Sequence, residues 1–146
     1  MVVSKMDLKR LPSDFRRVCR RHRVAFAVVF GSAAQDRATD HSDLDLAFWI
    51  DGEPSTSCEL DLVNALTPLW HRNDLDVVVL NHANPLLQWQ IASTGRPLYR
   101  RWMGPFHRFQ LYAMKRYDDN KKLLALQDLF LDRFLKGVRP AWQTSS

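Results

Sequence analysis

The apolar run at residues 24–30, which ends in Gly31, constrains the fold of this chain more than any other feature. β-Branched and aromatic side chains fill the run without a polar interruption, and that pattern favours a strand buried on both faces. Such a strand needs neighbouring strands to pair with and helices to cover it. The run therefore predicts a sheet with helices packed against it.

Periodic patterns place the other elements around this strand. Helical patterns occupy 13–22, 57–71, 84–94 and 104–136. Strand patterns occupy 24–30, 44–50, 75–80 and, at an expected sheet edge, 97–101. The fold class is therefore mixed α/β (α+β), with a small mixed sheet backed by helices and a long C-terminal helix. With 146 residues, one domain spanning 1–146 is expected.

Capping signals set the expected helix boundaries. Ser13 is the expected N-cap of the first helix, and Thr56-x-x-Glu59 has the form of a capping box before the second. The third helix has the clearest limits, because Asn84 precedes a proline and Gly95 follows the last periodic residue.

Acidic side chains stand where the second and third strands begin. Asp43 and Asp45 are two residues apart, so on a strand their carboxylates point to the same face. Asp76 precedes the third apolar run and joins them if those strands are neighbours. Three carboxylates this close repel one another, and divalent cations relieve the repulsion. Mg²⁺ is held by one or two carboxylates together with substrate phosphate oxygens, and two such ions suit an in-line displacement.

Gly31 and Ser32 supply the complementary half of such a site. Glycine lets the backbone approach a phosphate closely, while amide N–H groups and the serine hydroxyl can hold the β- and γ-phosphates. A surface Asp-x-Asp or a Gly-Ser turn alone carries little information. Their joint order, strand, Gly-Ser, spacer, Asp-x-Asp strand and Asp strand, indicates a site for a metal-bound triphosphate.

The order of these residues resembles the signature of minimal nucleotidyltransferases in the DNA polymerase β-like superfamily. Gly31-Ser32, ten residues and Asp43-Leu44-Asp45 match its first part, and Asp76 matches its third acid. The resemblance covers about 8–102, followed by a helix at 104–136 and a tail at 137–146. It implies a nucleotidyltransferase fold, with Mg²⁺ (two ions) as cofactor and ATP as substrate.

The resemblance also implies roles for these residues. By it, Asp43, Asp45 and Asp76 are both the catalytic and the metal-binding residues, and Asp76 helps to deprotonate the acceptor. Gly31 and Ser32 would bind the nucleotide. Asp74 lies two residues before Asp76 and is an open second candidate.

After this core the chain continues only as one long helix and a tail. This short C-terminal part resembles that of the MNT antitoxins of HEPN/MNT toxin–antitoxin systems. That resemblance implies an antitoxin that transfers AMP from ATP to a tyrosine of a cognate HEPN RNase toxin. The toxin's own Arg-x4–6-His-x-Tyr motif is missing here, because Val24 stands at the tyrosine position after Arg16 and His22. Two alternatives stay open: a non-catalytic antitoxin that acts by steric binding, and nucleotidyl transfer to RNA or a small molecule.

The C-terminal helix favours a protein partner. Its aromatic residues fall all round the helix, whereas a helix packed on one sheet needs only one apolar stripe. The excess fits either a protein interface, homo-oligomeric or hetero-oligomeric, or burial of both faces within the domain.

Charge and cysteine content leave other questions open. The net charge is +5, and arginines crowd the first helix and the last third of the chain. Such a surface binds nucleic acid or an acidic protein, steers nucleotides, or is merely a solvated basic face. Without an aromatic–basic RNA motif, nucleic acid is not the expected substrate.

Cys19 and Cys58 are expected to be buried, reduced thiols. Neither a membrane span nor a signal peptide is recognised, so a cytoplasmic location is expected.

Overall fold

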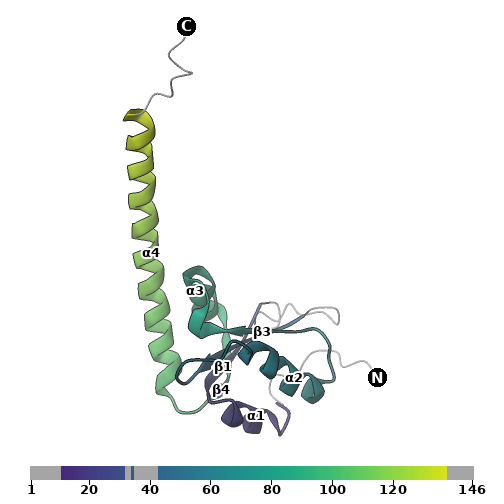
Figure 1. Cartoon of the computed structure of the whole chain (residues 1–146). Coiled ribbons are helices and arrows are strands. Elements are labelled where there is room, and N and C mark those ends of the chain that lie inside the picture. The colour runs from purple at the N-terminus through teal and green to yellow at the C-terminus, as the bar shows by residue number, and fades with distance from the viewer. Residues whose placement is uncertain (1–10, 32–33, 35–42, 138–146) are drawn as a thin grey trace.

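The computed structural model describes residues 11–31, 34 and 43–137 (Figure 1). The strands are β1 (Val24–Phe30), β2 (Leu44–Ile50), β3 (Leu75–Val79) and β4 (Arg96–Arg100). They form one sheet in the order β3-β2-β1-β4. β1 is antiparallel to both β2 and β4, whereas β2 and β3 are parallel. The expected mixed sheet, with the 97–101 region at one edge, is confirmed.

β1 lies inside the sheet and is buried along nearly its whole length. Its residues are divided between two cores, so the prediction that this strand is buried on both faces is confirmed. β3 ends at Val79, one residue earlier than expected, because Leu80 begins the 3₁₀ turn η1 (Leu80–His82). The side chain of Asn81 in that turn accepts from the Ile50 N–H and donates to the Ile50 carbonyl, both at 2.9 Å.

Two helices cover one face of the sheet. α1 (Phe15–Arg21) and α2 (Cys58–Trp70) bury one core with alternate residues of β1, β2 and β3. Cys19 and Cys58 lie in this core as free thiols, as expected. Burial raises the pKa of Cys19 to about 12, so this thiol stays protonated and unreactive.

Both of these helices begin differently from the expectation. The N-cap of α1 is Asp14 and not Ser13, and its side chain makes no capping bond. The N-cap of α2 is Ser57, so the Thr56–Glu59 capping box does not form. Glu59 instead accepts a hydrogen bond from the Val79 N–H at 3.2 Å and so ties α2 to β3. A tertiary partner has replaced the local one.

α3 (Pro85–Thr94) covers the other face together with the start of α4 (Gly104–Gly137). Asn84 caps α3 as predicted, accepting from the Leu87 N–H at 2.9 Å. Gly95 ends it with extended backbone. A Cβ on Gly95 would overlap with Val28 of β1 and with the Ile91 carbonyl. The close approach of helix and strand therefore requires glycine.

α4 is 34 residues long, and only its first part contacts the domain. Phe106, Phe109 and Ala113 are buried against the sheet, whereas every residue from 121 to 137 is exposed. Figure 1 shows this second half projecting away from the sheet. At 1.5 Å per residue, the exposed half extends about 25 Å. Within the described part of the chain, no helix is both long and apolar enough to cross a membrane.

Candidate functional site

One end of the sheet brings the acidic residues together. In the antiparallel pair, Phe30 at the end of β1 is the register partner of Asp45. In the parallel pair, Asp45 is the partner of Asp76. Two carboxylates on adjacent strands therefore stand side by side, next to the point where the chain leaves β1 at Gly31. The predicted adjacency of the second and third strands is confirmed.

The pleat assigns these carboxylates to one face. Leu44 and Leu46 point into the core under α1 and α2, so Asp45 between them faces the opposite side, as Ala47 does. Val77 also points into the first core, so its neighbour Asp76 shares the face of Asp45. Asp43 lies just before β2 and is itself exposed.

The carboxylates affect one another electrostatically. The pKa of Asp45 is raised, first by burial and then by the negative charges of Asp76 and Asp43. Like charges and partial desolvation both disfavour the ionised form. A bound cation would favour the ionised form of Asp45, because its positive charge stabilises the negative carboxylate that burial and the neighbouring acids disfavour.

Gly31 shapes the space beside Asp45. Its φ is +71°, in the left-handed region that side chains other than glycine rarely adopt. A Cβ at this position would overlap with Oδ2 of Asp45. The glycine therefore both turns the chain out of β1 and leaves room for the carboxylate. Ser32 and the spacer at 35–42, in which a helical turn was expected, lie outside the described residues.

Asp74 is held by Arg72. The guanidinium donates from Nε to Oδ1 at 2.7 Å and from a terminal nitrogen to Oδ2 at 2.6 Å. This hydrogen bonding lowers the pKa of Asp74 and raises that of Arg72. The Asp74 carbonyl in turn accepts from the Leu44 N–H at 3.1 Å, at the start of β2. Between the two candidates, Asp74 thus has a structural partner, and Asp76 faces Asp45.

Arg72 was missed in the sequence. Its only signal there is an Arg-x-Asp spacing, which is too common to indicate a role. Arg72 holds the Asp74 side chain, and the Asp74 carbonyl accepts from the Leu44 N–H at the start of β2, the strand that carries Asp45. We expect these contacts to help position the carboxylate site.

The donor set fits a hard divalent cation. Carboxylate oxygens are what Mg²⁺ prefers, and it needs only one or two of them beside phosphate and water. Among the described residues, no three acidic, histidine or cysteine side chains are close enough to form a complete metal cage. The pair Asp45 and Asp76, with Asp43 nearby, matches a cation completed by a phosphate substrate better than a structural metal.

Adjacent strand-borne carboxylates beside a glycine turn define a nucleotidyltransferase-type domain. The family described as "Polymerase beta, Nucleotidyltransferase" matches residues 14–102. Because this match covers more than half of the chain, the protein belongs to that family. A search of curated proteins found no significant match.

Solved structures show the same fold over nearly the whole chain. A crystal structure of a toxin–antitoxin with AMP-PNP contains a chain with a TM-score of 0.65 and 20% identity, covering 89% of this chain and 99% of that one. A structure of tri-AMPylated Shewanella oneidensis HEPN toxin in complex with MNT antitoxin matches with a TM-score of 0.58 and 19% identity, covering 85% and 95%. The overall fold is therefore shared with chains of toxin–antitoxin structures.

Proposed function

We propose that this protein is an antitoxin that transfers AMP from ATP to a tyrosine hydroxyl of a HEPN toxin partner. The observation that carries the proposal is the register pairing of Asp45 with Asp76 beside Gly31, in a chain of the nucleotidyltransferase family. The toxin partner is suggested by the structures that share the whole fold, one of which contains an AMPylated HEPN toxin with its MNT antitoxin.

The transfer is a single in-line displacement. The tyrosine oxygen attacks the α-phosphorus of ATP, a new O–P bond forms, and the bond to the pyrophosphate leaving group breaks. The phenolic proton passes to the carboxylate of Asp76, the more exposed of the paired acids. Gly31 and Ser32 hold the outgoing phosphates through their backbone amides and the serine hydroxyl.

Asp43, Asp45 and Asp76 would hold Mg²⁺ in this site. When bound, the metal supplies charge neutralisation at the attacking and leaving oxygens. The protein's own contribution is position: β2 and β3 fix two carboxylates at neighbouring register points. Arg72 holds the turn from which β3 starts.

The projecting half of α4 is the proposed docking surface for the toxin. Its large apolar side chains are half exposed or more; they are Leu123, Leu124, Leu126, Leu129, Phe130, Leu131, Phe134 and Leu135. At 100° per residue they spread over roughly 240° of the helix circumference. A helix this apolar on most of its surface is normally buried, and most helical stability in proteins comes from tertiary packing of the apolar face.

The alternative that both faces of this helix are buried within the domain does not hold for 121–137, because every residue there is exposed. The projecting half of α4 could instead be covered by a second copy of this chain. Measuring the mass of the complexes in solution distinguishes such a homodimer from a complex with the toxin. Purified alone, a homodimer through α4 would persist after the toxin is added. A toxin-binding surface predicts instead a mixed complex that replaces any self-association.

Co-expression with the candidate toxin tests the proposal. Wild-type protein should restore growth to cells that express the toxin, and the Asp43→Ala, Asp45→Ala double variant should fail to do so while still co-purifying with the toxin. Asp119→Ala, an exposed acid on α4 before the projecting half, is the matched control and should protect fully. Protection by the double variant would show steric neutralisation and would overturn the catalytic proposal.

A further inference from the structure

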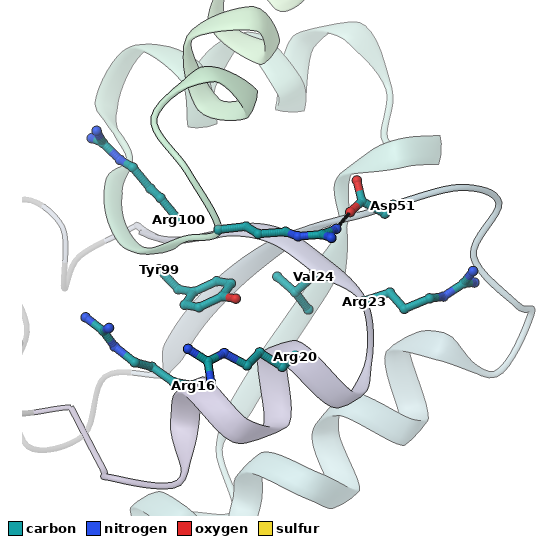
Figure 2. A pocket seen from close by; sticks show the side chains of 8 residues that line it. Arg16, Arg20, Arg23, Val24, Asp51, Tyr99 and Arg100 are labelled. Carbon is teal, nitrogen blue, oxygen red and sulfur yellow. Dashed lines mark hydrogen bonds and ion pairs between the residues drawn. The ribbon is translucent and has the colours of Figure 1, made fainter.

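A polar cavity lies away from the carboxylate site. It has a volume of about 590 Å³ and lies between α1, the start of β1 and the end of β4 (Figure 2). Its walls are mainly Arg16, Arg20, Arg23, Tyr99, Arg100 and Arg101. Nothing in the nucleotidyl-transfer proposal uses this cavity.

The cavity carries an uncompensated positive charge. Five arginines line it, but Asp51 is its only acid, and Asp51 is already paired with Arg101. Arg16, Arg20 and Arg23 have no acidic partner among the residues that the structure describes. The Arg100 guanidinium donates to the Met103 sulfur at 3.8 Å and lies over the ring of Phe106, a residue of the other core. Three guanidinium groups, those of Arg16, Arg20 and Arg23, are therefore available to an anion.

The fold arranges these groups around a hydrophobic floor. Arg16 and Arg20 are one helical turn apart, so they leave α1 on the same face. Figure 2 shows Arg20 beneath the ring of Tyr99, Arg16 directed to the left of it, and Val24 beside the ring. Tyr99 and Val24 are almost fully buried. No described buried side-chain oxygen or nitrogen lacks a partner, so the unbonded Tyr99 hydroxyl must reach the solvent of the cavity.

The cavity stands at the opposite end of the sheet from the acids. Val24 pairs with Ile50 at one end of β1, and Phe30 pairs with Asp45 at the other. A seven-residue strand spans about 20 Å between these ends. A single ATP in the carboxylate site would not fill both, so the cavity needs a ligand of its own.

We propose that this cavity binds a chain of phosphates, either the backbone of single-stranded RNA or a free polyphosphate. Three available cations exceed what one phosphate requires. All of them are arginines, whose planar forks suit phosphate oxygens and stack on aromatic or base rings. An accessible tyrosine hydroxyl adds a neutral donor between them. The ligand is bound rather than used as the acceptor, because the reacting carboxylates are at the far end of the sheet.

Fluorescence anisotropy tests this with a labelled oligouridylate of about ten nucleotides, a length typical of one single-strand site. EDTA is present throughout, so that metal-dependent nucleotide binding does not contribute. Arg16→Ala with Arg20→Ala should weaken binding by about tenfold or more, as expected for hydrogen bonds to charged groups. The slope of log affinity against log salt should fall by about 0.7 for each phosphate that the variant no longer neutralises.

The matched control is Arg17→Ala with Arg21→Ala, which removes the same charge from the same helix but outside the cavity. It should change affinity by less than about twofold, since long-range effects of exposed charges are screened. Arg23→Gln, in the turn between α1 and β1, is a second test from outside the helix and should also weaken binding. Competition with unlabelled tripolyphosphate distinguishes a free polyphosphate ligand from an RNA ligand. Tripolyphosphate should displace the labelled RNA fully only if the phosphates alone are enough for binding.

Three results would overturn the proposal. One is equal weakening by both arginine pairs, which means a general charge effect. Another is the absence of saturable binding at low salt. The third is displacement of the RNA by polyglutamate more readily than by tripolyphosphate, which assigns the cavity to an acidic protein segment.

Discussion

Gly31 leaves open the space that the carboxylate of Asp45 occupies. A Cβ on residue 31 would overlap with Oδ2 of Asp45, and the glycine backbone is left-handed at φ +71°. The turn that is expected to approach the phosphates and the acid that is expected to bind metal are therefore fitted to one another. Changing either residue should alter the other's environment.

Gly31→Ala should therefore lose both stability and transfer. The left-handed backbone costs a non-glycine residue about 1–2 kcal/mol, and the new methyl group displaces the Asp45 carboxylate. Gly52→Ala is the matched control, because Gly52 also has a positive φ (+76°) but its Cβ would be 3.7 Å from the nearest atom, on Arg23. Thermal unfolding should show a loss in both variants, and AMP transfer should fall only in Gly31→Ala. A transfer-competent Gly31→Ala would contradict the fit described here.

Asp45→Asn should stabilise the metal-free protein while abolishing transfer. Burial and two neighbouring acids raise the pKa of Asp45, so the folded state binds this proton more tightly than the unfolded state. Protonated Asp45 therefore contributes its whole stabilisation at a pH below the pKa of the unfolded state. That contribution to the free energy of unfolding is lost as pH rises through the pKa of the folded state. In EDTA at pH 7, Tm should rise by a few degrees in the variant, and the gain should shrink in acid. Asp128→Asn should leave Tm unchanged at both pH values.

Arg72→Met should slow transfer and weaken the fold modestly. The Arg72–Asp74 pair is partly exposed, so its loss should cost about 0.2–1 kcal/mol at neutral pH. The pKa of Asp74 is lowered by Arg72, so the stability it contributes is lost as pH falls through the folded pKa. Chemical denaturation should thus show wild type and variant converging in acid. Arg17→Met, which breaks the exposed pair with Asp14, should leave transfer unchanged.

Phe130→Asp should prevent toxin binding without unfolding the domain. Phe130 is 70% exposed on the apolar side of α4, and anchoring aromatic residues typically contribute about 2 kcal/mol or more to an interface. Titration calorimetry should show affinity for the toxin falling by about 30-fold or more. Ala125→Asp adds the same charge on the polar side of the helix and should bind nearly as well. Equal losses in both variants would indicate a charge effect rather than a docking face.

Local patterns predicted the framework of the fold well. The bounds of β1 and β2, the Asn84 cap and the glycine at the end of α3 follow from residue type and spacing, and all are confirmed. The Thr56–Glu59 capping box was wrong, because Glu59 bonds to β3, twenty residues away in the chain. A local motif cannot reveal a competing tertiary partner.

The site was predictable where strand order determined it. Adjacent parallel strands placed Asp45 beside Asp76, as the spacing indicated. Arg72 and the arginine cavity were not predictable in the same way, since the cavity joins α1 to β4, eighty residues apart. The crowding of arginines in the sequence did not show that Arg16 and Arg100 share one cavity, because only the antiparallel pairing of β1 with β4 brings them together.

AMP transfer itself is the most direct test of the central claim. The protein is incubated with Mg²⁺, α-labelled ATP and its toxin partner, and label on the toxin is followed by gel and by mass spectrometry of its tyrosines. Wild-type protein should label a toxin tyrosine, and the Asp43→Ala, Asp45→Ala double variant should bind the toxin without labelling it. An unlabelled toxin in a stable complex with wild-type protein, or labelling by the double variant at the wild-type rate, would contradict the account.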